Sequence, residues 1–177
     1  VVADGEMVRS WMEAGIRDSK TITDGAILKM AKQIKGTKGA VIKVAYTNMV
    51  KYNELYLKFD SNLNKFLAWL HGRSLNSALE EKKPVWGLLD QFTKQPLVQK
   101  YVEDLDFELG RRPKAEEDPV VAAASIIARA TWLEQMKKLS ELAGGKLPKG
   151  SGVQAKEKAT SLYQQLGEAR MKEFCKL

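Results

Sequence analysis

The chain has 177 residues, of which 44% are hydrophobic and 29% charged, and this balance excludes an intrinsically disordered protein. No apolar run approaches the roughly 20 residues of a membrane-spanning helix, so we expect no membrane partner. Lysine and arginine outnumber aspartate and glutamate by 29 to 22, and the net charge of +7 favours a polyanionic partner. One cysteine excludes an internal disulfide and, together with one histidine, excludes a tetrahedral zinc site. With no signal-peptide pattern at residues 1–6, we expect a cytoplasmic location.

The first third of the chain predicts one helix and one strand. Thr23 is a suitable N-cap, and apolar residues recur at helical spacing from there to Gly36. Residues 40–47 contain the adjacent β-branched pair Val41 and Ile42 among mainly apolar neighbours. We therefore expect a helix over 24–35, followed by a strand that is flanked by loops.

The middle of the chain predicts a second helix and a second strand. An apolar stripe at helical spacing begins after Ser61 and ends in the charged residues before Pro84, which indicates a helix of about 20 residues. Residues 85–92 are nearly all apolar up to Asp90, the pattern of a strand covered on both faces.

The last third predicts mainly helix. Asp118 and Pro119 are the N-cap and first residue of a long helix over 120–142, which Gly144 ends. A final helical stretch begins near Val153 and is broken near Gly167.

Strands that alternate with helices predict an α/β fold. Two clear strands are fewer than the usual ~5 to 6 of a sheet. Either further strands lie in ambiguous stretches such as 105–109, or part of the sheet is absent from this chain.

Carboxylates are the best candidates for chemistry. Asp90 ends a predicted strand, and open α/β sheets bind ligands beyond the carboxyl ends of their strands, although a turn or a pairing with lysine would also explain this residue. The acidic residues of 114–118 are a second candidate, although they would also complement the dipole of the following helix. The glycine-rich nucleotide-binding motifs are absent, and neither His71 nor Cys175 has the partners of a catalytic residue. Carboxylates that bind Mg²⁺ or Mn²⁺ and act on a phosphate remain plausible.

Seven further segments are informative when they are taken together: 15–20, 52–56, 68–74, 88–92, 114–116, 121–129 and 146–150. Their order and spacing extend over nearly the whole chain. Together they resemble ribonuclease HIII, a branch of the type 2 ribonucleases H. Asp-Gln-Phe at 90–92 and Lys-Ala-Glu at 114–116 favour this branch over ribonuclease HII.

The resemblance implies a ribonuclease H-like fold, with a mixed sheet flanked by helices, and endonucleolytic hydrolysis of the RNA strand of RNA/DNA hybrids. Family members use four acidic residues that bind two Mg²⁺ or Mn²⁺ ions. By position, Asp90 and Glu116 are the third and fourth of these catalytic and metal-binding residues, with Glu117 as the alternative to Glu116. Resemblance and chemistry together suggest six substrate-binding residues, each of which could equally have an ordinary local role. They are Ser19, Lys20, Arg73, Ser125, Lys146 and Lys149.

The family's opening motif, Asp-Glu-[Ser/Ala]-Gly-Lys-Gly, is absent, and Asp4-Gly5-Glu6 does not replace it. We therefore expect residues 1–177 to be a partial catalytic domain whose sheet is incomplete at its N-terminal strand. An upstream substrate-binding domain and a C-terminal tail would lie outside it, and the complete protein would be a monomer. Two alternatives remain: a module that binds hybrids without cutting them, and a basic scaffold with no nucleic-acid role.

Overall fold

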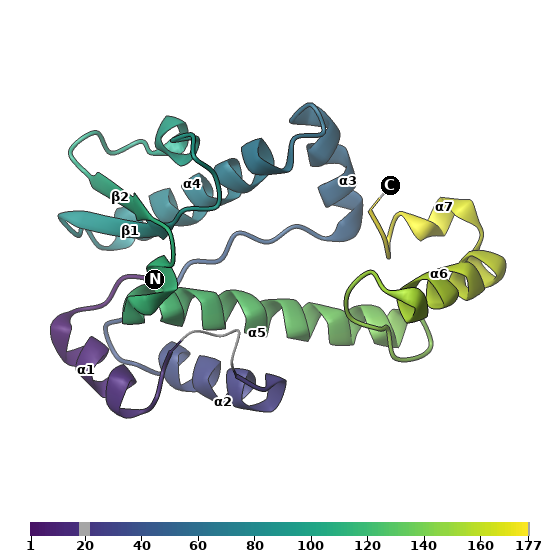
Figure 1. Ribbon diagram of the computed structural model, residues 1–177, viewed down its shortest axis with the longest axis horizontal. Helices are drawn as coiled ribbons and strands as arrows, with labels where there is room; N and C mark the ends of the chain where they lie inside the picture. The colour runs from purple at the N-terminus through teal and green to yellow at the C-terminus, as the bar shows by residue number, and fades with distance from the viewer. Residues whose placement is uncertain (18–21, 177) are drawn as a thin grey trace. The chain divides into compact units, whose positions relative to one another are not determined.

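The computed structural model describes residues 1–17 and 22–176, and it consists of helices and one small sheet (Figure 1). Contacts within the chain define two compact units, which are described separately below. The first contains residues 1–45 and 64–131, and the second contains 46–63 and 132–177. The elements are α1 (Gly5–Glu13), α2 (Asp24–Lys35), α3 (Met49–Lys58), α4 (Leu63–Glu81), β1 (Trp86–Asp90), the 3-10 helix η2 (Val98–Tyr101), β2 (Glu108–Arg112), the 3-10 helix η3 (Ala115–Glu117), α5 (Pro119–Leu142), α6 (Val153–Leu166) and α7 (Glu168–Met171).

The sheet of the first unit consists of two parallel strands, β1 and β2. Trp86 pairs with Glu108 and Asp90 with Arg112, so both strands end at the same edge. The Gln91 N–H donates to the Arg112 carbonyl oxygen at 3.0 Å and extends the pairing by one residue. Strands that alternate with helices confirm the α/β class, and β2 begins within the stretch 105–109 that was suspected to hide a strand.

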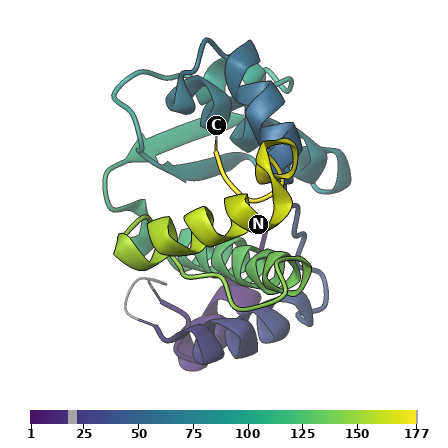
Figure 2. The same ribbon diagram turned by 90° about the vertical axis from the view of Figure 1, so that its right-hand side faces the viewer.

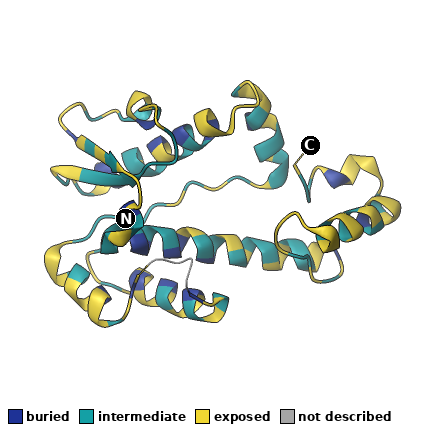
Figure 3. Cartoon of the chain, in the orientation of Figure 1, coloured by how far each residue is buried: buried dark blue, intermediate teal, exposed yellow. Residues whose placement is uncertain are grey.

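The core of the first unit forms where helices meet. In Figure 1, α2 lies alongside the first half of α5, and Figure 3 shows dark blue, buried residues on both. Small residues such as Ala122, Ala123 and Ala130 are buried along this half of α5 and allow close approach. An ion pair of 2.8 Å between Asp24 and Arg129 joins the two helices at the edge of this contact. The largest fully buried side chains are Trp11, Phe66, Ile27, Ile34, Ile126 and Val98.

The predicted helix boundaries are confirmed by their capping contacts. The Thr23 side chain accepts a hydrogen bond from the Ala26 N–H, and α2 ends at Gly36. Asp118 Oδ1 accepts from the N–H groups of Val120 and Val121 at 2.8 and 3.3 Å. The first turn of α5 therefore has its free N–H groups satisfied, as a good N-cap requires.

Two predictions about extended structure need correction. The strand expected over 40–47 is not formed, because its pairing with the other described residues is limited to an isolated antiparallel bridge between Val41 and Val2. Farther along, the Ala45 N–H donates to Ser74 Oγ at 3.0 Å, so a side chain takes the place of a neighbouring strand. The strand at 86–90 is confirmed but is covered only in part, since Trp86 is 60% exposed at its start.

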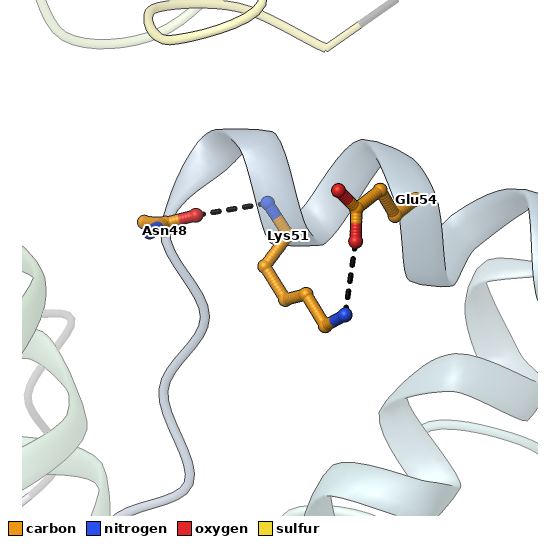
Figure 4. A network of polar contacts seen from close by, with 3 residues as sticks. All are labelled: Asn48, Lys51 and Glu54. Carbon is orange, nitrogen blue, oxygen red and sulfur yellow. Dashed lines mark hydrogen bonds and ion pairs between the residues drawn. The ribbon is translucent and has the colours of Figure 1, made fainter.

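The helix α3, in the second unit, was not predicted. Asn48 Oδ1 accepts from the Lys51 N–H at 2.8 Å, and the Lys51 ammonium contacts Glu54 at 2.9 Å (Figure 4). This capping asparagine is the sequence signal that could have revealed the helix.

The rest of the second unit is built from the second half of α5 and from α6 and α7. Figure 2 shows α6 and α7 facing the viewer. Its small core contains Ala143, Leu162 and Met171. The Asn53 amide of α3 donates to the carbonyl oxygens of Lys172 and Cys175 at 3.4 and 3.1 Å, which ties α3 to the last residues described. No helix in the described residues is both long and apolar enough to cross a membrane.

Candidate active site

Asp90 lies at the carboxyl end of β1, at the edge where both strands end. Its Oδ1 accepts a hydrogen bond from the Ala115 N–H at 3.1 Å. Because Ala115 begins η3, this bond joins the segment at 90–92 to the segment at 114–116. The two segments singled out by sequence resemblance are therefore in direct contact.

Glu116 follows Ala115 within η3, a short turn that backbone hydrogen bonds stabilise. Lys114 precedes it in the left-handed conformation (φ 56°), and Ala115 is fully buried. Glu116 Oε2 is buried, whereas the neighbouring Glu117 is exposed. This difference favours Glu116 over Glu117 as the inward-facing carboxylate of the pair.

The chemistry of these two side chains suits a divalent cation, because Mg²⁺ and Mn²⁺ prefer oxygen ligands. Asp90 and Glu116 come from β1 and η3, which contact each other. The described residues contain no group of three or more histidine, cysteine, aspartate or glutamate side chains arranged to hold a metal ion. The pair fits a metal by ligand type and supplies only part of a complete ligand set.

The segment after Asp90 forms one wall of a small pocket. The His71 ring of α4 stacks on Phe92, with centroids 5.3 Å apart and planes inclined by 17°. Desolvation lowers the pKa of His71 below its ordinary value, although the residue as a whole remains exposed. The pocket is lined by Leu89, Asp90, Gln91, Phe92, Thr93, Gln95, Leu97, Val98 and Arg111.

Arg111 is the charged pocket residue that the sequence did not reveal, and Thr93, Gln95, Leu97 and Val98 of the same pocket were not predicted either. Arg111 lies on β2 opposite Leu89, one residue before the partner of Asp90. Only residues 105–109 were suspected to form a strand, so no pattern in the sequence placed position 111 beside Asp90.

The predicted substrate-binding residues are distributed over both units. In the first, Arg73 is exposed on α4 with its guanidinium 5.2 Å from the centre of the Trp69 ring, and Ser125 is half-buried on α5. In the second, Lys146 is exposed after α5, and the Lys149 ammonium lies 5.9 Å from the centre of the Trp132 ring. Ser19 and Lys20 lie outside the described residues.

The sequence model of the family described as Ribonuclease HII matches residues 1–177. The chain belongs to the ribonuclease HII family. The match covers both compact units.

Individual relatives of this chain are also named as ribonucleases H. A protein named Ribonuclease HIII from Protochlamydia amoebophila is 34% identical over 164 residues, which cover 92% of this chain and 54% of the relative. One of the same name from Chlamydia caviae is 34% identical over 177 residues, which cover 98% and 58%. The resemblance to ribonuclease HIII is thus confirmed, and the chain spans somewhat more than half the length of these relatives.

Solved structures of the family share the fold. The crystal structure of Bst-RNase HIII in complex with Mn²⁺ matches with a TM-score of 0.84 and 31% sequence identity, over 99% of this chain and 58% of that chain. The ribonuclease H-like α/β architecture expected from the sequence is therefore confirmed.

Proposed function

We propose that this chain carries part of the active site of a metal-dependent endonuclease, which hydrolyses the RNA strand of RNA/DNA hybrids. The observation that carries the proposal is the hydrogen bond between Asp90 and Ala115, which brings a carboxylate at a strand end against the turn that holds Glu116. The names of the relatives and the Mn²⁺ in one of their structures support it.

In this proposal, Asp90 and Glu116 hold Mg²⁺ or Mn²⁺. The Ala115 N–H engages Oδ1 of Asp90 and fixes the orientation of the carboxylate. Among the described residues, Oδ2 receives no hydrogen bond, so it is available to a cation. A bound divalent ion supplies Lewis acidity toward phosphate oxygens and lowers the pKa of water. Further carboxylates must complete the site, because two are fewer than the four used in the family.

The basic side chains are proposed to hold the substrate. A duplex binds through its phosphates to lysine and arginine, and a protein recognises RNA through its 2′-hydroxyl groups. We assign phosphate contacts to Arg73, Lys146 and Lys149, and contacts with the sugar to Ser125. Ser19 and Lys20 keep the same proposed role from the sequence alone.

We further propose that both compact units belong to one catalytic domain, and that the complete protein acts in the cytoplasm as a monomer. The single cysteine supports a reducing compartment. A sedimentation measurement on the complete protein tests the oligomeric state.

Cleavage of a labelled RNA/DNA hybrid tests the function. This chain would be compared, in Mg²⁺ and in Mn²⁺, with a longer version that carries an Asp-Glu-Ser-Gly-Lys-Gly strand ahead of Val1. We expect the longer version to cut the RNA strand and this chain to cut far more slowly. Binding without cutting by both would favour a hybrid-binding module, and neither binding nor cutting would favour a scaffold.

A further inference from the structure

The guanidinium of Arg111 is the starting point for an inference about a second kind of site. Its Nη1 atom is buried and has no hydrogen-bond partner among the described residues. Leaving a buried polar group without a hydrogen-bond partner destabilises a fold, and more so when the group is charged. Native proteins rarely retain such a group unless a ligand, an ion or water completes it.

The surroundings of Arg111 are suited to an anion. Gln91, Thr93 and Gln95 line the same pocket and carry side-chain groups that can donate hydrogen bonds. Two hydrogen bonds stabilise this wall: the Gln91 N–H donates to the Arg112 backbone carbonyl, and the Gln95 N–H donates to the side-chain Oγ1 of Thr93 at 3.4 Å. Among the described residues, Asp90 is the only acidic residue that lines the pocket, and no carboxylate forms an ion pair with Arg111.

We propose that Arg111 forms an anion site at the mouth of this pocket, where a reorientation of its guanidinium frees Nη1 to bind one phosphate group of a nucleic-acid backbone. A guanidinium offers two parallel N–H donors that match two phosphate oxygens, which a lysine cannot do. The assignment of the bound phosphate to a nucleic acid rests on the function proposed above and on the net charge of +7. The anion site itself does not depend on either. Arg111 pairs with Leu89 and Asp90 pairs with Arg112, so the side chains of Arg111 and Asp90 belong to opposite faces of the two-stranded sheet, and the anion site is distinct from the metal ligands.

The first test uses inorganic phosphate as the probe and needs no catalysis. The side-chain N–H signals of the arginines would be followed by NMR during a phosphate titration of this chain. We expect one guanidinium to shift in a saturable way, and Arg111→Lys to remove that signal while keeping the charge. Arg112→Gln is the matched control, because it removes an exposed guanidinium from the next position of β2.

The second test identifies the source of the phosphate. Binding of a labelled hybrid would be measured without divalent metal over a range of salt concentrations. We expect Arg111→Gln to weaken binding about tenfold and to lower the salt dependence by about one released ion, with a smaller effect for Arg112→Gln. Thermal unfolding of each variant separates a loss of binding from a loss of fold.

The outcomes distinguish this proposal from the proposed function. If inorganic phosphate shifts no guanidinium signal, or if Arg111→Lys leaves the shifted signal in place, there is no anion site at Arg111. If phosphate binds there but Arg111→Gln leaves hybrid affinity unchanged, the nucleic-acid source is wrong. A chain that binds phosphate at Arg111 and neither binds nor cuts a hybrid would overturn the proposed function and retain the anion site.

Discussion

The carboxylate of Asp90 accepts a hydrogen bond from the backbone N–H of Ala115, across a sequence separation of 25 residues. An acceptor at the end of one strand thereby fixes the turn that follows the neighbouring strand. The orientation of Asp90 and the position of η3 depend on each other, so a change at either should disturb both.

Asp90→Asn should separate the charge of this residue from its structural contact. The amide oxygen can still accept from Ala115, so we expect an unchanged unfolding temperature. Losing an anionic metal ligand should slow hybrid cleavage by the longer version about 100-fold or more. Asp106→Asn, at an exposed position before β2, is the matched control and should leave the rate unchanged. Equal rates for Asp90→Asn and the control would show that Asp90 binds no catalytic metal.

Glu116→Gln and Glu117→Gln form a second matched pair. Glu116 Oε2 is buried beside the turn, whereas Glu117 is exposed, so only the first substitution should weaken Mn²⁺ binding, by about tenfold. The measurement is a calorimetric titration of the longer version, and of each variant of it, with Mn²⁺. Weaker binding by Glu117→Gln alone would exchange the roles of the two glutamates.

Asp118→Ala should lower the free energy of unfolding by about 1 kcal/mol, because two N–H groups at the start of α5 lose their acceptor. Asp118→Asn keeps an acceptor oxygen and should lose much less. Denaturant unfolding of both variants makes the comparison. If both lose the same free energy, the charge of Asp118 matters to α5 more than its hydrogen bonds.

Gly72→Ala should be strongly destabilising, by about 2 to 3 kcal/mol, because a Cβ there would collide with the Cβ of Tyr101. Gly25→Ala is the control, since a Cβ at this helical position meets nothing within 4 Å and should stabilise α2. Denaturant midpoints of the two variants should therefore move in opposite directions. A neutral Gly72→Ala would mean that α4 and Tyr101 separate readily.

His71 should make stability depend on pH. Desolvation lowers the pKa of its imidazole in the folded state, so the unfolded chain binds a proton more readily. The stability contributed by the neutral ring is present above the unfolded pKa of about 6.5 and is lost as pH falls through that value toward the folded pKa. His71→Gln should flatten the unfolding free energy between about pH 7 and pH 5. An unchanged slope in this variant would show that other groups cause the dependence.

The helices were predictable because their signals are local. Thr23, Asp118 and Gly36 mark the ends of α2 and α5 through contacts within three or four residues. The expected strand at 40–47 failed for the opposite reason. A strand exists only when another segment pairs with it, and there only Val2 does so in the described part of the chain.

The candidate site was predictable only in part. Resemblance placed Asp90 and Glu116 in one site, but no periodicity could show that the Ala115 N–H would reach Asp90, since the contact depends on how β1 and β2 pair. Arg111 could not be predicted because it lines a pocket together with residues of the segment that connects the two strands, and this arrangement depends on the tertiary fold.

The parallel pairing of β1 and β2 has a kinetic consequence. A parallel pair needs a long connection, here residues 91–107, and closing such a loop lowers chain entropy before any strand contact compensates. The Ala115 amide gains its acceptor only after β2 has docked on β1. Hydrogen exchange at that single amide therefore reports how often the docked pair opens. Substitutions within 91–107 would tune this opening rate without touching either carboxylate.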